Sequence, residues 1–338
     1  MTIKEIAQLA GVSRMTVSNV INKKYSKVSK KTVEKVNAII EENNYIPNLS
    51  ARNLSAQSSK IIAIIVPLVY GNDSLFSDPY TAQIVGILEN NLRNKGYFAM
   101  IRSVKALSDT VTFLNSWNID GAIFIFPKPE INVKQLLKQV STEIVFIDSY
   151  QEVESSLSIN IDDYKGTYLA TKYLIEKGHK KIGFAAPKRS NNLMELRYRG
   201  YEDALKQFQI DVNSSYFFES DISLNSGIKI GKQIAKEKKL TAVITTADVV
   251  AIGIIDGARS ENCRIPDDLS VIGFDNLTIA NYCYPKLTTV NQDINKKAEL
   301  AISLLFDRIE KKNELPNKIK LDVSLIERSS VKGLKEIG

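Results

Sequence analysis

Between residues 60 and about 330, the chain alternates short apolar runs that end at Pro, Gly or Asp with amphipathic stretches of helical period. Strands that are apolar along their whole length are typical of parallel sheets covered by helices on both faces. About seven such units over roughly 270 residues exceed what one ordinary open sheet holds. The pattern therefore predicts an α/β core of two doubly wound parallel-sheet lobes, with a cleft at the carboxyl ends of the strands.

The individual elements of this core follow from the same runs. The predicted strands are 61–66, 98–102, 122–126, 144–147, 181–185, 242–246 and 270–274. The predicted helices include 80–95, 163–177, 195–207, 225–238 and 249–261.

Positive charge gathers in the first sixty residues, which hold ten Lys or Arg but only four Asp or Glu, whereas the whole chain carries +7. A compact basic segment on a nearly neutral body is typical of a protein that grips DNA with one part only. The apolar pattern predicts three helices here: 3–10, a second that begins at Arg14, and a third capped by Ser29. Gly11 suits the left-handed residue that ends the first helix, and Ser13 can cap the second. The segment is therefore predicted to be an all-α helix-turn-helix head.

The second helix of such a head would place its first residues against base edges in the major groove. Arg14 is the candidate to read guanine through a bidentate contact, and Asn19 can address a neighbouring adenine. Met15 offers apolar contact, for instance to a thymine methyl group. Three short polar side chains suit phosphate oxygens, namely Thr16, Ser18 and Asn22. The alternative is a solvated three-helix scaffold whose lysines only aid solubility.

Several classes of protein are disfavoured by composition. Cys263 and Cys283 are the only cysteines and His179 is the only histidine, which argues against a disulfide-stapled scaffold, a zinc site or a His-based triad. No G-x-G-x-x-G or P-loop pattern follows a strand, and no nucleophile–base pair emerges. No catalytic residue, metal or cofactor is predicted.

The longest apolar run, 61–69, is about half as long as a segment that crosses a bilayer, and the N-terminus lacks the apolar core of a signal peptide. A cytoplasmic protein without membrane partners is therefore expected.

Specific segments along the whole chain carry a family resemblance. In the first sixty residues they are 2–22, 28–29, 44–48 and 51–54; in the body they are 78–80, 174–179, 197–201, 272–275 and 285–290. Together they resemble the lactose-repressor (LacI/GalR-type) family of transcriptional regulators, from residue 2 to about residue 330.

The resemblance implies a domain organisation. Residues 1–45 would form the helix-turn-helix head, 46–59 a hinge helix or linker that orders on operator DNA, and 60–338 a two-lobed core like that of a periplasmic sugar-binding protein. The chain would cross between the lobes three times, near 160, 290 and 320. The N-terminal lobe would then hold about 60–160 and 290–320, and the C-terminal lobe about 161–289 and 321–330.

The resemblance also extends the DNA-binding set to Ser29, Asn48, Ala51 and Leu54. Leu54 takes the place of the family's wedge leucine, which enters the minor groove and opens a base step. Asn48 and Ala51 would lie along the same minor-groove face. By itself, Leu54 would be an ordinary apolar helix residue.

An effector would bind between the lobes, where polar residues follow predicted strands. The family uses positions matching Asp148, Arg197, Asp248 and Asp275 to bind effector, through bidentate bonds to sugar hydroxyls or similar groups. Each has an alternative role: Asp248 as a helix cap, Asp148 and Asp275 in turns, Arg197 in a surface ion pair. Tyr80 would stack on a sugar face or pack inside the cleft.

The chain departs from the family pattern at two places in this cleft. Ala247 stands where the family commonly has Asn, and Tyr80-Thr81 stands where two aromatic residues are common. A usual inducer is therefore not assumed. Three carboxylates against one guanidinium disfavour a strongly anionic ligand and favour a neutral sugar or polyol.

These observations predict a transcriptional regulator, a repressor, that binds double-stranded operator DNA as a homodimer with an affinity set by the effector. Three alternatives remain. A sugar-binding transport protein would need a signal peptide and would leave the basic head unexplained. A Rossmann-like enzyme would need a cofactor motif or a catalytic pair. A nucleoid protein would explain the charge but not the cleft.

Overall fold

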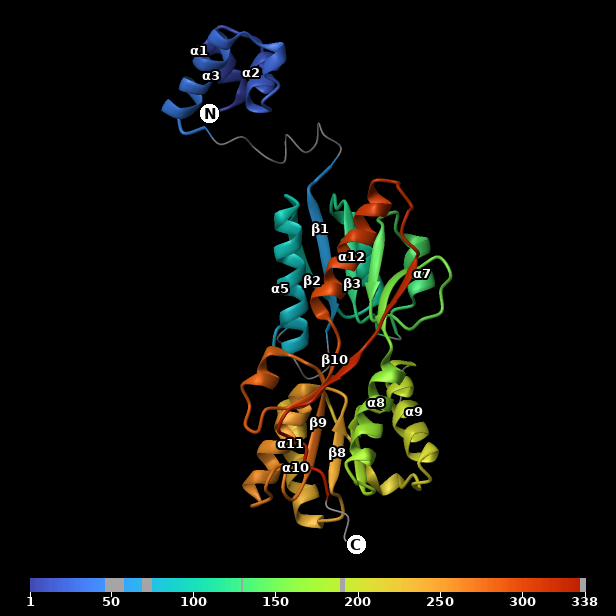
Figure 1. Ribbon diagram of the computed structural model, residues 1–338. Coiled ribbons are helices and arrows are strands. Elements are labelled where there is room, and N and C mark those ends of the chain that lie inside the picture. Colours follow the sequence, from blue (N-terminus) through green and yellow to red (C-terminus); the bar gives the residue numbers. More distant parts are fainter. Residues whose placement is uncertain (46–57, 69–74, 129, 189–191, 335–338) are drawn as a thin grey trace. The chain divides into compact units, whose positions relative to one another are not determined.

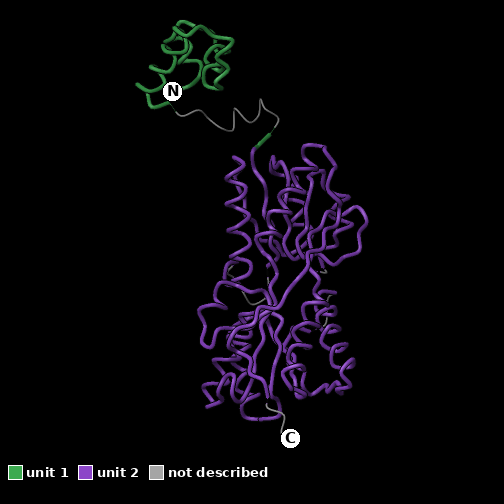
Figure 2. The backbone as a smooth tube through the Cα atoms, viewed as in Figure 1, with its two compact units in different colours: residues 1–59 green, residues 60–338 purple. Residues whose placement is uncertain are grey.

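The computed structural model describes residues 1–45, 58–68, 75–128, 130–188 and 192–334. Two compact units divide the chain, residues 1–59 and 60–338, and each is described by itself (Figure 2). The described residues of the first unit form helices α1 (Ile3–Ala10), α2 (Arg14–Ile21) and α3 (Lys30–Glu42), with a 3-10 turn η1 (Tyr25–Lys27) between the last two.

Local sequence explains where these three helices begin and end. Thr2 and Glu5 form a reciprocal capping box at the start of α1, and Gly11 ends that helix with a φ of 68°. The Ser13 hydroxyl accepts a hydrogen bond of 3.0 Å from the Thr16 amide and so caps α2. A small apolar core holds the helices together, made of Ile6, Ala7, Ala10, Val17, Val20 and Val36.

Two six-stranded sheets form the second unit. The first has the order β11-β5-β4-β3-β1-β2 and all of its pairs are parallel. Its strands are β1 (Ile61–Pro67), β2 (Phe98–Val104), β3 (Gly121–Ile125), β4 (Ile144–Ile147), β5 (Leu157–Ile161) and β11 (Lys318–Leu321). We call this sheet and its helices the N lobe.

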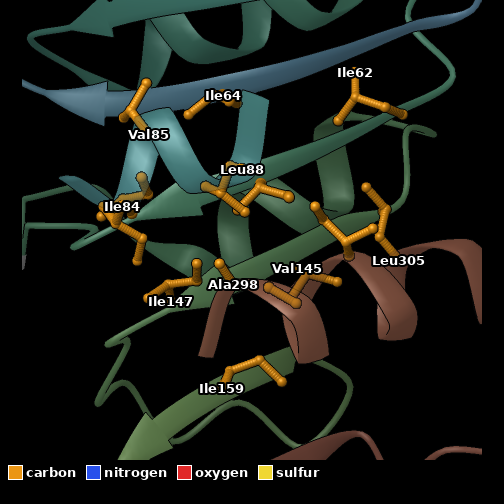
Figure 3. Packing of buried hydrophobic residues seen from close by; sticks show 14 of the residues in the cluster. Ile62, Ile64, Ile84, Val85, Leu88, Val145, Ile147, Ile159, Ala298 and Leu305 are labelled. Carbon is orange, nitrogen blue, oxygen red and sulfur yellow. The ribbon is translucent and has the colours of Figure 1, made fainter. Parts of the chain in front are cut away.

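Helices cover both faces of the N-lobe sheet because its central strands are apolar on both sides. On one face lie α5 (Pro79–Asn94) and α12 (Ile294–Ile309), whose Leu88, Ala298 and Leu305 pack on strand residues such as Val145 (Figure 3). The other face is covered by α6 (Leu107–Ser116) and α7 (Val133–Gln139).

The second sheet has the order β12-β10-β9-β8-β6-β7, and β12 is antiparallel to β10. Its strands are β6 (Ile182–Ala186), β7 (Phe217–Glu219), β8 (Ala242–Thr245), β9 (Ser270–Asp275), β10 (Thr288–Asn291) and β12 (Ser324–Ile326). Helices α8 (Asp163–Glu176) and α9 (Asn192–Gln207) cover one face; α10 (Leu224–Glu237) and α11 (Asp248–Ser260) cover the other. Short 3-10 turns η2 (Ser214–Tyr216) and η3 (Thr278–Asn281) complete this C lobe.

Glycines allow α10 and α11 to pack with their backbones in contact. A Cβ atom at Gly257 would lie 2.1 Å from the carbonyl oxygen of Ile228, and one at Gly231 would lie 2.3 Å from that of Ile254. Real Cβ atoms do not approach carbonyl oxygens so closely, so these positions require glycine.

The chain passes from one sheet to the other at three points: between β5 and α8, between β10 and α12, and between β11 and β12 (Figure 1). The predicted fold class is confirmed: a helical head and two doubly wound parallel-sheet lobes. The seven predicted strands are present, and β5, β7, β10, β11 and β12 are additional.

Candidate DNA-reading helix and effector cleft

Helix α2 presents the predicted base-reading residues at its start. Arg14 is its first residue and is exposed, and Met15 is 74% exposed although its side chain is apolar. The opposite side of the helix is anchored by Val17 and Val20, which are buried in the core of the head. An exposed apolar residue beside an exposed guanidinium is suited to contact with a partner rather than to solvation.

The short polar residues of the head make local hydrogen bonds as well as facing outward. The Thr16 hydroxyl lies 2.9 Å from that of Ser13, and the Asn22 amide nitrogen donates to the Ser18 hydroxyl over 3.3 Å. Asn19 is half-buried on the same helix. Ser29 is exposed and caps α3 by accepting a hydrogen bond of 3.3 Å from the Thr32 amide. Asn48, Ala51 and Leu54 lie outside the described residues.

The lysines of the head are available to an anion. Seven are exposed: Lys4, Lys23, Lys24, Lys27, Lys30, Lys31 and Lys35. Within residues 1–45, none of them forms an ion pair with a carboxylate in the structure. Unpaired surface cations around an exposed reading helix are what phosphate contact requires.

The N-lobe half of the cleft is built around Asp148, which follows β4 and has a φ of 55°. Its carboxylate accepts a hydrogen bond of 3.0 Å from the Tyr80 hydroxyl and is paired with the Lys297 ammonium at 2.8 Å and 2.9 Å. Burial and the neighbouring Asp148 charge raise the pKa of Tyr80 well above its usual value. The Tyr80 ring packs against Phe126, with 5.2 Å between ring centroids. Tyr80 is thus packed inside the cleft and holds Asp148.

The C-lobe half is built around Arg197, a buried residue of α9. Its Nε donates to Asp163 over 2.7 Å and its Nη1 to the Thr246 carbonyl over 2.6 Å. The guanidinium lies 3.6 Å from the centroid of the Phe274 ring, a cation–π contact. The Tyr150 hydroxyl donates to the second oxygen of Asp163. Arg197 is therefore held in a buried ion pair, not in a surface one.

Asp248 lies in the interior of the C lobe. Its two oxygens accept hydrogen bonds from the Thr289 hydroxyl at 2.6 Å and from the Leu277 amide at 2.7 Å. Burial raises the pKa of Asp248 to about 7. Ala247, not Asp248, is the N-cap residue of α11, so the alternative role as a helix cap is not what the structure shows.

Asp275 ends β9 in a left-handed conformation, with a φ of 116°, which non-glycine residues rarely adopt. Its Oδ1 accepts a hydrogen bond of 2.5 Å from the Gln292 side chain. Burial raises the pKa of Asp275 well above its usual value, and the nearby Asp248 charge adds to this while Arg197 opposes it.

Gln292 joins the two halves. It follows β10 at the second crossover, donates to Asp275 in the C lobe, and accepts a hydrogen bond from Lys297 of the N lobe. A continuous chain of hydrogen bonds therefore runs from Tyr80 and Asp148 through Lys297 and Gln292 to Asp275.

The structure brings Tyr80, Asp148 and Asp275 into this one network, whereas Arg197 is held by Asp163 and Asp248 by Thr289. Sequence reasoning missed Lys297, Gln292, Asp163 and Tyr150. A signal for Lys297 existed: with Ile294, Ala298 and Ala301 it occupies the apolar stripe of a helix, where a lysine is out of place.

A groove of about 560 Å³ opens beside this cluster. It is lined by Tyr150, Asn160, Asp163, Tyr164, Arg199 and Lys318 among others. None of the five predicted effector residues lines it. Asp163, which holds Arg197, and Tyr150, which donates to Asp163, do line it. An adjoining groove of about 380 Å³ includes Ser149.

Two buried hydroxyls near the cluster lack a hydrogen-bond partner in the described structure: Ser149 Oγ, just after β4, and Thr246 Oγ1, just after β8. Buried polar groups are nearly always satisfied, so these two hydroxyls, one in each lobe, are unused hydrogen-bonding groups beside the cluster. Within the described ranges, no group of His, Cys, Asp and Glu is arranged to hold a metal ion. No helix in those ranges has the length and apolar character that a membrane span needs.

A helix-turn-helix unit followed by a two-lobed core with a polar cleft defines the class of ligand-responsive DNA-binding regulators. Residues 2–48 match the model of bacterial regulatory proteins of the lacI family, and residues 171–331 match a periplasmic binding protein-like domain. The chain is 31% identical over 337 residues to the HTH-type transcriptional repressor PurR of Mannheimia succiniciproducens, with 98% of each chain covered. It belongs to the lacI family.

Solved structures of transcriptional regulators resemble the chain over nearly its whole length. The lac repressor dimer bound to operator and the anti-inducer ONPF matches with a TM-score of 0.85 and 26% identity, covering 98% of this chain and 99% of that one. The complex of the transcriptional regulator CelR with cellobiose matches with a TM-score of 0.73 and 26% identity, at 98% and 99% coverage. The chain is thus a DNA-binding transcriptional regulator with an effector-binding core, and not an enzyme.

Proposed function

We propose that this regulator is a homodimeric repressor in the cytoplasm whose operator affinity is set by a neutral sugar or polyol bound between the N and C lobes. The choice of a neutral ligand is supported by the charge balance of the residues between the lobes. Both buried cations are already paired, Lys297 with Asp148 and Arg197 with Asp163. Among the described residues, the buried cluster therefore offers no unpaired cation to a phosphate; Arg199 and Lys318, which line the neighbouring groove, are exposed to solvent.

The remaining carboxylates reinforce this selection. Burial raises the pKa of Asp248 to about 7 and that of Asp275 well above its usual value, so both carry less negative charge at neutral pH than exposed carboxylates do, and both can donate as well as accept when protonated. Together with the unpaired hydroxyls of Ser149 and Thr246, they suit a ligand rich in hydroxyl groups. The cellobiose held by the related regulator CelR is a ligand of this kind.

On DNA, α2 would enter the major groove with Arg14 at a guanine, Asn19 at a neighbouring adenine and Met15 against a thymine methyl group. Thr16, Ser18, Asn22 and Ser29 would contact the backbone. Asn48, Ala51 and the wedge Leu54 would act in the minor groove from the 46–59 hinge.

Exposed apolar side chains on both lobes support the homodimer. The N lobe exposes Phe98 and Ile101 on β2, the edge strand of its sheet, and Trp117 after α6. The C lobe exposes Tyr282 and Tyr284 at 81% and 79%. We assign these exposed aromatic and aliphatic residues to the association surface, and the matching lac repressor structure is a dimer on operator. Two heads on one dimer would read a two-fold operator.

Effector binding would change the angle between the lobes and so the separation of the two hinges. Effector and operator must then alter each other's affinity by the same factor.

A footprinting experiment on genomic fragments that flank the protein's own coding region tests the function. The full chain is expected to protect a two-fold site, and a neutral sugar from a panel of neutral and phosphorylated sugars is expected to change that protection. Isothermal titration with the same panel measures binding directly. Tight binding to a phosphate ester alone would reject the ligand class, and failure to retard any duplex at moderate salt would reject the DNA-binding role.

A further inference from the structure

Lys297 is a fully buried lysine whose relative exposure is 0%. It lies on the face of α12 that packs on the N-lobe sheet, between the apolar residues Ile294 and Ala298. Its neighbour Lys296 is exposed. A buried ammonium is costly unless its charge is paired and its N–H groups are all satisfied, so the surroundings of Lys297 must be built for it.

Three acceptors from three different elements surround the ammonium. Asp148 after β4 offers both carboxylate oxygens at 2.8 Å and 2.9 Å, the Tyr80 hydroxyl of α5 lies at 3.1 Å, and the Gln292 side-chain oxygen after β10 completes the set. Three acceptors match the three N–H donors of a primary ammonium. The Tyr80 hydroxyl donates in turn to Asp148, and the Gln292 amide nitrogen donates to Asp275, which fixes the orientation of each acceptor.

This arrangement is a binding site for a primary ammonium group, and it stands in the cleft where the effector is proposed to bind. We propose that Lys297 fills this site as an internal ligand and thereby determines the effector class. With Lys297 in place, Asp148 is neutralised and closed to amino ligands. Without it, Asp148 becomes a buried carboxylate that binds an external primary amine. The inference about effector class rests on the proposed function; the ammonium site itself rests only on these contacts.

The variant Lys297→Ala removes the three methylene groups and the ammonium, which together have the shape of n-propylammonium. We expect the full-length variant to unfold several degrees below the wild type, since an unpaired buried carboxylate is strongly destabilising. Propylammonium chloride should raise its unfolding temperature and should show saturable binding by isothermal titration. Propanol at the same concentration, which fills the cavity without a charge, should restore much less.

Two controls fix the interpretation. The wild type and Lys296→Ala, which loses an exposed lysine on the same helix, should show neither the destabilisation nor the response to propylammonium. Equal effects of propylammonium and propanol on Lys297→Ala, or no effect of either, would overturn the proposal.

A double-mutant cycle covers the case in which Lys297→Ala does not fold. Lys297→Met keeps an unbranched side chain as far as Cε but lacks the ammonium, so it leaves Asp148 unpaired, whereas Lys297→Met combined with Asp148→Asn removes both charges. The double variant is expected to be more stable than Lys297→Met alone, because replacing both members of a buried pair is tolerated better than breaking it. Additive losses would overturn the proposal. Operator retardation and sugar binding by the wild type would be unaffected by that outcome, so the two proposals fail separately.

Discussion

The Thr289 hydroxyl donates a hydrogen bond of 2.6 Å to the carboxylate of Asp248. This bond joins strand β10 to the start of helix α11, which lie 41 positions apart in the sequence. The second oxygen of that carboxylate accepts from the Leu277 amide, and the Leu277 side chain packs into the apolar core of the N lobe. Asp248 therefore holds in place a C-lobe loop on which the N lobe rests.

The raised pKa of Asp248 makes this contact sensitive to pH. A carboxyl group with a pKa of about 7 when folded and near 3.8 when unfolded stabilises the folded state fully below the lower value. That stabilisation is lost as the pH rises through 7. Asp248→Asn can still accept from Leu277 and can donate to Thr289, so its unfolding free energy should fall less between pH 4 and pH 7 than that of the wild type.

Chemical denaturation at a series of pH values measures the difference between the two proteins. The raised pKa of Asp275 acts in the same direction, and because the Asp248 charge contributes to it, Asp248→Asn also reduces this part of the pH dependence. Parallel pH profiles for wild type and Asp248→Asn would show that Asp248 does not titrate in this range.

Gly257→Ala should destabilise the protein because the new methyl group would meet the Ile228 carbonyl oxygen on the neighbouring helix. Overpacking of this kind costs about 1–3 kcal/mol. Gly86 on α5 is the matched control: it is exposed and nothing lies within 4 Å of its missing Cβ. Gly86→Ala should stabilise by about 0.5–1 kcal/mol. Equal unfolding temperatures for the two variants would contradict the close packing of α10 and α11.

Arg14→Ala should weaken operator binding by about 1–3 kcal/mol and relax the base preference at one position per half-site. Competition binding with a set of single-base operator variants measures both effects. If affinity for unrelated duplex DNA falls by the same factor, Arg14 contacts phosphate and does not read a base.

Leu54→Ala should reduce operator bending and specific affinity while leaving non-specific binding nearly unchanged, since the wedge acts only where a base step is opened. Circular-permutation electrophoresis reports the bend angle. A variant that bends the operator as much as the wild type does would exclude the wedge role.

Tyr282→Asp should weaken homodimer formation by roughly tenfold or more, because interface aromatic residues often contribute about 2 kcal/mol. Sedimentation velocity over a range of concentrations gives the dissociation constant. Phe208→Asp, which changes another exposed aromatic residue just after α9, should leave the dimer intact. If both variants dimerise like the wild type, the interface lies elsewhere.

The fold could be predicted from the sequence wherever strands are apolar on both faces. Two of the strands that escaped prediction, β5 and β11, break that rule. Ser158 and Asn160 alternate with apolar residues in β5, and Lys318 and Lys320 do so in β11. The reason is that β11 is the edge strand of the N-lobe sheet, β5 lies next to it, and both line a groove. Periodicity identifies a central strand far more easily than such an edge strand.

The cleft could be predicted only in part. Asp148 and Asp275 could be proposed as site residues because they directly follow recognisable strands. Their partners could not be, since the bond from Lys297 to Asp148 spans 149 positions and only the folded chain brings the two together. The charge balance keeps the excess of carboxylate that the sequence suggested. Lys297 and Arg197 are closed into ion pairs with Asp148 and Asp163, whereas Asp248 and Asp275 form no ion pair within the described residues.

The third crossover has a consequence for how the core assembles. Only two residues separate β11, the outer strand of one sheet, from β12, the outer strand of the other. A chain cut before residue 318 would lack β11 and β12, so each sheet would lose one of its outer strands. Each lobe therefore depends on the same C-terminal segment. We therefore expect the N and C lobes to fold and unfold together, so that a substitution that destabilises one lobe also destabilises the other.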